Sequence, residues 1–97
     1  MAQPFSDQRS VESVARRLEQ TRLVLELGQS EFAKRAGLAQ NTYNQFERGK
    51  RRLSLEAAHA LCDEFKLTLD WLYQGDLSGM PHAMAGTLRR VQRSTQP

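Results

Sequence analysis

The chain has 97 residues, a length that suits one compact domain and leaves little for a second. Hydrophobic residues make up 39%, charged residues 26%, and the mean hydropathy is −0.63. No segment approaches the ~18 consecutive apolar residues of a membrane span, and the polar first ten residues lack the apolar stretch of a signal peptide. The single cysteine, Cys62, excludes an internal disulfide. We therefore expect a cytoplasmic protein with no membrane association.

Positive charge is concentrated in two places. The net charge is only +3, but four of the five residues from Arg48 to Arg52 are basic. The end of the chain carries Arg89, Arg90 and Arg93, and no acidic residue follows Asp76. Clustered cations on an otherwise nearly neutral protein favour local binding of a polyanion over non-specific electrostatic association.

The chain divides into three parts by composition. Residues 1–9 are short and polar, contain Pro4, and are expected to form a flexible arm. Residues 10–75 show apolar side chains at helical spacing, and no alternation typical of strands. Capping residues and glycines divide this part into five short helices, over residues 10 to about 26–28, 29–36, 40–48, 54–65 and 69–73. The sequence therefore predicts an all-α, compact five-helix domain.

Residues 76–97 leave two alternatives open. Pro81 is suited to the start of a helix that continues through Val91, with Met84, Leu88 and Val91 as a thin apolar stripe. The same residues are also compatible with a frayed tail, because an isolated helix of two or three turns is marginal in water. An extra helix here would be available to aid dimerisation.

The stretch from Gln29 to Gly49 predicts a helix-turn-helix. Two short helices separated by a glycine-containing turn must cross steeply, so the inner position of the first helix has to be small, as Ala33 is. Gly37 supplies the sharp turn through the left-handed conformation. Tyr43 and Phe46, three residues apart, anchor the second helix on the domain.

The exposed face of that second helix is rich in amides. Amide side chains are poor at stabilising an exposed helix, but Asn and Gln match the donor and acceptor that adenine presents in the major groove. A polar, solvated face is the competing interpretation, and the adjacent turn and basic cluster count against it. We take four residues as candidates for reading bases: Gln40, Asn41, Asn44 and Gln45.

Residues 14–75 resemble the phage-repressor-like family of Xre or Cro-type helix-turn-helix proteins. The resemblance rests on Gln29-x-Glu31-Phe32-Ala33, Gly37, Tyr43-x-x-Phe46-Glu47-Arg48-Gly49, Ser54-Leu55-Glu56 and Leu69-Asp70-Trp71-Leu72. It implies that the four amides face base edges in double-stranded DNA. It also implies that phosphates are bound by Gln29, Arg48, Lys50 and Arg51, with Gln29 available to brace Gln40. Arg22 and Glu47 occupy positions that form an internal ion pair in relatives.

Three positions depart from the family pattern. Ala39 stands where a Ser or Thr usually caps the recognition helix, which blurs where that helix begins. Glu26 stands where many relatives have glycine, so we expect the turn after the first helix to be built differently, through Gly28. Tyr43 replaces a commoner aliphatic residue, and its hydroxyl needs a partner or a path to solvent.

Enzymatic and metal-binding functions find little support. His59 and Cys62 lie three residues apart near Glu56 and Asp63, but a closed zinc site usually needs four ligands, and the other histidine, His82, lies in the tail. Cys62 falls on an apolar stripe, with no base in position to activate its thiol. We expect no metal, no cofactor and no enzymatic activity.

The sequence thus predicts a DNA-binding transcription regulator associated with the nucleoid. A homodimer on a palindromic operator is expected, because one domain presents only one recognition helix. Repression is the default outcome, although contact with RNA polymerase would allow activation. The alternative is an antitoxin or adaptor whose main partner is a toxin or another regulator, and which binds DNA for autoregulation.

Overall fold

The computed structural model describes residues 7–95 and contains only α-helices there. The predicted arm over residues 1–9 therefore lies mostly outside the described residues. The helices, in chain order, are α1 Val11–Val24, α2 Gln29–Arg35, α3 Gln40–Glu47, α4 Leu55–Phe65, α5 Leu69–Gln74 and α6 His82–Thr95. The all-α prediction is confirmed, with six helices rather than five.

Three helices begin with a side-chain cap and two do not. The hydroxyls of Ser10, Ser54 and Thr68 each accept a hydrogen bond from a backbone N–H in the first turn of α1, α4 and α5. Gly28 and Ala39 precede α2 and α3 without a side-chain hydrogen bond. Because a missing cap typically costs ~1 kcal/mol, α2 and α3 depend on packing against the rest of the domain.

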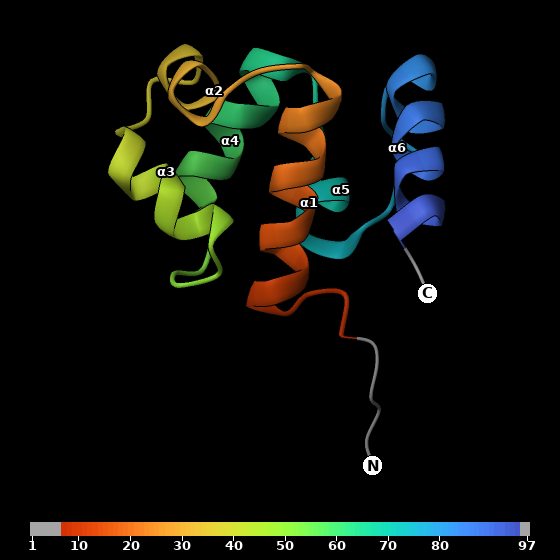
Figure 1. Cartoon of the computed structure of the whole chain (residues 1–97), viewed down its shortest axis with the longest axis horizontal. Helices are drawn as coiled ribbons and strands as arrows, with labels where there is room; N and C mark the ends of the chain where they lie inside the picture. Colours follow the sequence, from red (N-terminus) through yellow and green to blue (C-terminus); the bar gives the residue numbers. More distant parts are fainter. Residues whose placement is uncertain (1–6, 96–97) are drawn as a thin grey trace.

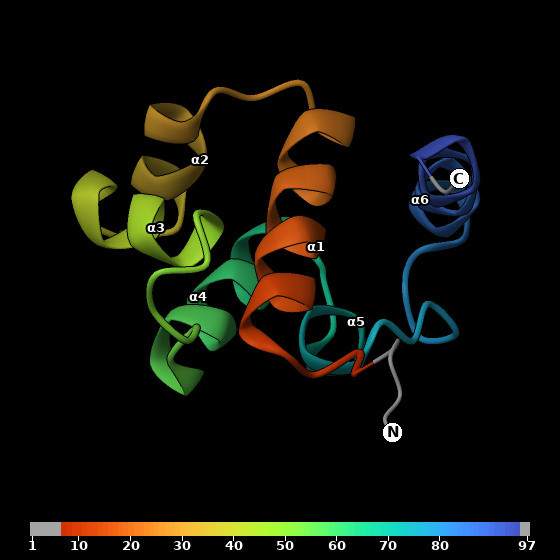
Figure 2. The same cartoon turned by 60° about the horizontal axis from the view of Figure 1, so that its bottom comes forward.

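Helix α1 lies in the middle of the molecule. Helices α2 and α3 lie on one side of it and α6 on the other, as Figures 1 and 2 both show. Helix α1 packs against α3, α5 and α6. The fully buried large side chains of this core are Trp71, Tyr43, Phe32, Leu18, Leu61, Leu72 and Leu88.

The last part of the chain is a helix that shares this core. Ala85 and Leu88 of α6 are buried, as are Leu77 and Met80 in the segment before it. Of the two alternatives for residues 76–97, the described part therefore takes the helical one. Burial of Leu88 against the core supplies the packing that an isolated short helix would lack.

The turn between α1 and α2 differs from the expectation. Helix α1 ends at Val24 rather than near 26–28, and Glu26 adopts a left-handed backbone with φ +61°. Gly28 has φ −76° and precedes α2 in an extended conformation. The expectation that Gly28 forms this turn was wrong, because Glu26 itself takes the left-handed conformation that favours glycine.

Replacing Glu26 with glycine should raise the free energy of unfolding by about 1 kcal/mol. A left-handed residue with a Cβ costs roughly 1–2 kcal/mol, and glycine gives back part of that gain as backbone entropy. Urea unfolding of the two proteins measures the difference. Glu26→Ala is the control, since it keeps the Cβ and should bring no gain. Equal stability of the glycine and alanine variants would contradict this explanation.

Helix α1 has a second buried face that the sequence pattern did not indicate. Arg17 is 3% exposed and Gln20 is buried, although both are polar and stand between the apolar residues of α1. Thr21 accepts a hydrogen bond from the indole Nε1 of Trp71 at 2.9 Å and donates to the carbonyl of Arg17 at 2.7 Å. The face is buried because α5 and α6 cover it.

The Arg17 guanidinium is satisfied by neutral oxygens. It donates to the carbonyl of Leu72 at 3.1 Å, to Oε1 of Gln8 at 3.1 Å and to the Gln8 carbonyl, and it lies over the ring of Trp71. Burial, with a smaller effect of neighbouring Arg16, lowers the pKa of Arg17 to about 10. Arg17 thereby holds the end of the arm and the end of α5 together.

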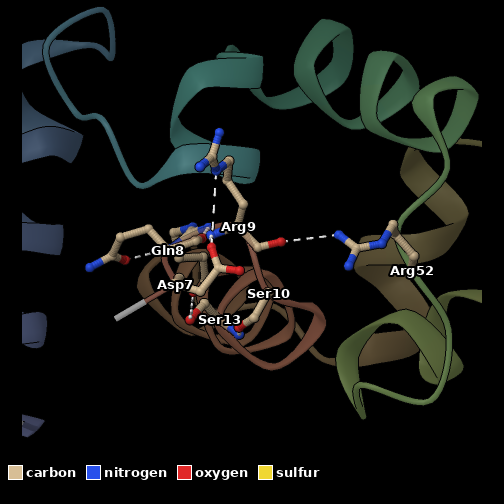
Figure 3. Close-up of polar contacts among 7 residues, drawn as sticks. Asp7, Gln8, Arg9, Ser10, Ser13 and Arg52 are labelled. Carbon is tan, nitrogen blue, oxygen red and sulfur yellow. Dashed lines mark hydrogen bonds and ion pairs between the residues drawn. The ribbon is translucent and has the colours of Figure 1, made fainter. Parts of the chain in front are cut away.

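Figure 3 shows how the end of the arm meets the loop between α3 and α4. The guanidinium of Arg52, in that loop, donates to the carbonyl of Arg9 at 3.0 Å. The carbonyl of Asp7 accepts from the hydroxyl of Ser13 at 3.0 Å. Residues 7–9 are therefore docked on α1 and on the loop, whereas the sequence predicted a flexible arm there.

Residues 7–95 contain neither a membrane-spanning helix nor a cluster of metal-binding side chains. None of their helices has the length and apolar character needed to cross a bilayer. No group of three or more metal-binding side chains occurs in this part of the chain. Cys62 is half-buried against the core, and burial together with Asp63 raises the pKa of its thiol to about 11, so it stays protonated at neutral pH.

Candidate nucleic-acid interface

Helices α2 and α3 form the predicted pair with a short turn. Gly37 has φ +75°, the left-handed conformation expected of it. Its N–H donates to the carbonyl of Lys34 at 3.0 Å, and that of Leu38 donates to the carbonyl of Ala33 at 2.9 Å. Ala33 is 1% exposed, and its small side chain lets α3 approach α2 closely.

Aromatic packing holds α3 on the domain. Tyr43 and Phe46 are buried. The rings of Phe32 and Tyr43 meet edge to face with centroids 5.3 Å apart, and Phe32 stacks on Phe65 at 4.5 Å. A helix of eight residues without a cap gains its position from these contacts, so its outward face is held rigidly.

The structure divides the four predicted base readers into two groups. Gln40, Asn41 and Gln45 are exposed on α3. Asn44 is half-buried, and its Oδ1 is buried with no hydrogen-bond partner among the described residues. An amide needs both its oxygen and its nitrogen to match adenine, so Asn44 in this conformation presents only its N–H groups.

The first residue of α3 is Gln40. Ala39 precedes it in an extended conformation, and its carbonyl accepts the first helical hydrogen bond, from Tyr43 at 3.0 Å. Gln40 therefore stands at the start of the helix, where the first-turn N–H groups have no partner within it.

Gln29, the first residue of α2, contacts a carboxylate. Its Nε2 donates to Oε2 of Glu47 at 3.1 Å. The sequence placed Gln29 at a phosphate and next to Gln40, but its amide nitrogen is directed at Glu47. Gln29 is half-buried, so part of its side chain stays accessible.

Glu47 is the centre of a polar cluster that joins α1, α2 and α3. Arg22 donates from Nε to Oε1 at 2.9 Å and from Nη2 to Oε2 at 2.8 Å, a bidentate ion pair between the two predicted partners. The side chains are 12% and 5% exposed, so water screens the pair little. The remaining Nη1 of Arg22 donates to the carbonyl of Leu27 at 2.9 Å.

Tyr43 completes this cluster. Its hydroxyl donates to Oε1 of Glu47 at 2.5 Å, so the buried hydroxyl has the hydrogen-bond partner that it needs. Burial and this hydrogen bond raise the pKa of Tyr43, so it stays neutral. Burial alone would raise the pKa of Glu47, but hydrogen bonds from Arg22, Tyr43 and Gln29 outweigh it and hold that pKa below its usual value. Tyr43 and Glu47 are four residues apart on a helix, a spacing from which this contact could have been predicted.

The cations after α3 point to solvent. Arg48, Lys50 and Arg51 are exposed around Gly49, whose φ of +73° ends the helix. None of the three forms an ion pair with a carboxylate of residues 7–95. Their charge is therefore available to an external anion beside the amides of α3.

A scan against protein families matches the helix-turn-helix family model to residues 18–72, which is more than half of the chain. The chain belongs to the phage-repressor-like helix-turn-helix family. The match covers the second half of α1 and all of α2 to α4, and ends within α5. Searches of the curated proteins and of the solved structures found no match. Family membership makes this chain a DNA-binding transcription regulator, in a family that is typically without enzymatic activity.

Proposed function

We propose that the protein is a sequence-specific regulator, acting as a repressor, that reads the major groove with α3. The observation that carries this proposal is the exposed face of Gln40, Asn41 and Gln45 beside three exposed cations that form no ion pair within residues 7–95: Arg48, Lys50 and Arg51. Amides distinguish base edges, whereas cations bind phosphates without reading sequence. The two kinds of side chain are neighbours here, as such an interface requires.

Each part of this surface has its own task in the proposal. Gln40, Asn41 and Gln45 contact bases, and Asn44 supplies only donors at the edge of the groove. Arg48, Lys50 and Arg51 bind the phosphate backbone beyond α3. Gln29 contacts a phosphate with the part of its amide that Glu47 does not engage. Each phosphate contact releases about one counterion and so makes binding more salt-dependent.

We further propose a homodimer on a palindromic operator. Helix α3 has eight residues, about 12 Å, and so reaches only a few base pairs. A second copy about 34 Å away would contact the next turn of the same DNA face and add its binding energy. Bound there, the dimer would block RNA polymerase.

Selection of bound fragments from random DNA tests the proposal directly. We expect one enriched sequence with two-fold symmetry and half-sites about one helical turn apart. Enrichment of no sequence would overturn sequence-specific reading. A second chain that co-purifies in stoichiometric amount would instead favour the antitoxin or adaptor role.

Gln45→Ala should relax the preference at one base pair of the selected operator by ~1–3 kcal/mol. Gln45 is exposed on α3, so its removal takes a base contact away without disturbing the core. Competition gel shifts with single-base operator variants measure the change. Glu31→Ala on α2, equally exposed, is the control and should retain full discrimination. Full discrimination by the Gln45 variant would remove it from the readers.

Lys50→Gln combined with Arg51→Gln should weaken binding to every DNA sequence. Each substitution removes one exposed cation, so the slope of log affinity against log salt should flatten by about two. Fluorescence anisotropy over a salt series measures the slope with an operator and with a random duplex. An unchanged slope would mean that these cations are only solvated surface.

A further inference from the structure

The second half of helix α6 exposes three arginines. Arg89, Arg90 and Arg93, the α6 arginine face, are all exposed. No acidic residue follows Asp76 in the sequence. Arg89 and Arg93 form no ion pair with a carboxylate of residues 7–95. Three arginines on one short helix carry as much charge as the whole chain, whose net charge is +3.

Helix α6 is far from the helix proposed to enter the major groove. The longest dimension of the molecule is 38 Å, and α3 and α6 lie near its two ends with α1 between them (Figure 1). The rotated view in Figure 2 shows the same separation. Tyr43 and Phe46 turn the inner side of α3 toward the core, so a straight duplex on its outward face lies on the opposite side of the core from α6.

The exposed residues of α6 fit DNA better than a membrane or a protein partner. Ala85 and Leu88 are buried in the core and Met84 packs against it, so α6 has no large exposed apolar side chain to insert into a membrane surface. The exposed large hydrophobic side chains among residues 7–95 are Leu23 and Leu55, and neither lies on α6, whereas a protein interface usually needs a large apolar or aromatic anchor. Interfaces with DNA are instead polar and strongly positive.

We propose that the α6 arginine face binds the phosphate backbone of a second DNA duplex, without sequence preference. Arg89 and Arg93 are four residues apart, so they project from the same side about 6 Å apart along the helix. One molecule then bridges two segments of DNA, one on α3 and one on α6. This inference rests on the proposed function, because it adds a second duplex to the one that α3 holds.

The same charges make the face unsuited to pairing of two copies. A two-fold axis through it would bring the arginines of both copies together, and like charges at such a contact repel. The dimer contact proposed above therefore lies elsewhere on the molecule.

A two-duplex capture experiment with the full chain tests the inference. An operator duplex is immobilised and loaded with protein, and a fluorescent duplex of random sequence is then added at low salt. We expect capture by the natural chain, and at least tenfold less capture by Arg89→Gln/Arg93→Gln, with unchanged binding of the operator. The salt slope of capture should flatten by about two in this variant.

The control is Arg16→Gln/Lys66→Gln, which removes the same charge from two other exposed positions and should capture normally. Normal capture by the α6 variant would overturn the inference, as would failure of the natural chain to capture while it still binds the operator. Failure to bind any duplex would instead overturn the proposed function. Release of the captured duplex by polyglutamate as readily as by random DNA would assign the face to an acidic protein.

Discussion

Glu47→Ala will destabilise the folded chain by about 3–5 kcal/mol, because it leaves the Arg22 guanidinium buried without its counterion. The same change removes the acceptor of Tyr43 and of Gln29. Urea unfolding at pH 7 measures the loss. Glu31→Ala is the matched control. The Oε2 of Glu31 lies 2.9 Å from the Nε of Arg35, but both side chains are exposed, and an exposed pair at this helical spacing contributes at most ~0.5 kcal/mol.

A second variant separates charge from packing in this cluster. Arg22→Met combined with Glu47→Leu removes both charges and should recover most of the stability lost by Glu47→Ala. A double variant as unstable as the single one would show that the packing, and not the stranded charge, carries the effect.

The contribution of Glu47 should also depend on pH with a defined sign. Its folded pKa lies below its usual value, so the unfolded chain binds the proton more readily. The stabilisation is then complete above the unfolded pKa of about 4.3 and is lost as the pH falls through the folded pKa. The stability difference between the natural chain and Glu47→Gln should therefore shrink below about pH 4. A difference that grows toward acid would contradict the lowered pKa.

Arg17→Ala is expected to cost roughly 3 kcal/mol, the second largest effect. The substitution removes charge-assisted hydrogen bonds to Leu72 and Gln8 and the packing of the guanidinium on Trp71. Arg17→Lys should recover only part of this loss, since an ammonium group cannot donate to separated oxygens with the geometry of a planar guanidinium.

Arg16 is the control for this prediction. It is the next residue along the same helix and is exposed, so Arg16→Ala should change the stability by no more than about 0.5 kcal/mol. Thermal or urea unfolding of the three variants gives the comparison. Equal effects at positions 16 and 17 would mean that the buried contacts of Arg17 do not stabilise the fold.

Much of the fold could be predicted from local signals. Ser10 and Ser54 cap helices, and Gly37, Gly49 and Gly75 take the left-handed turns that end them. These features depend on a few neighbouring residues, which is why a single sequence reveals them. The conformation of Glu26 was missed because nothing local distinguishes a strained glutamate from an ordinary one.

The burial of Arg17 and Gln20 could not be predicted in the same way. Both are polar residues of α1, and they are buried in a structure where α5 and α6 pack on that helix and Arg17 contacts Leu72 and Gln8. The same limit applies to Asn44, which has the residue type of a base reader but lies at the edge of the exposed face of α3. The residue type suggests a functional role, but packing between segments distant in the sequence decides whether the side chain is accessible for it.

The environment of Trp71 has a consequence for spectroscopy. It is the only tryptophan in the sequence, it is fully buried, and its indole donates to Thr21 within the core. Its fluorescence should therefore report loss of tertiary structure and remain nearly constant when a duplex binds at the surface of α3. Intrinsic emission can thus follow folding during a DNA titration, while occupancy is read independently from a dye on the DNA.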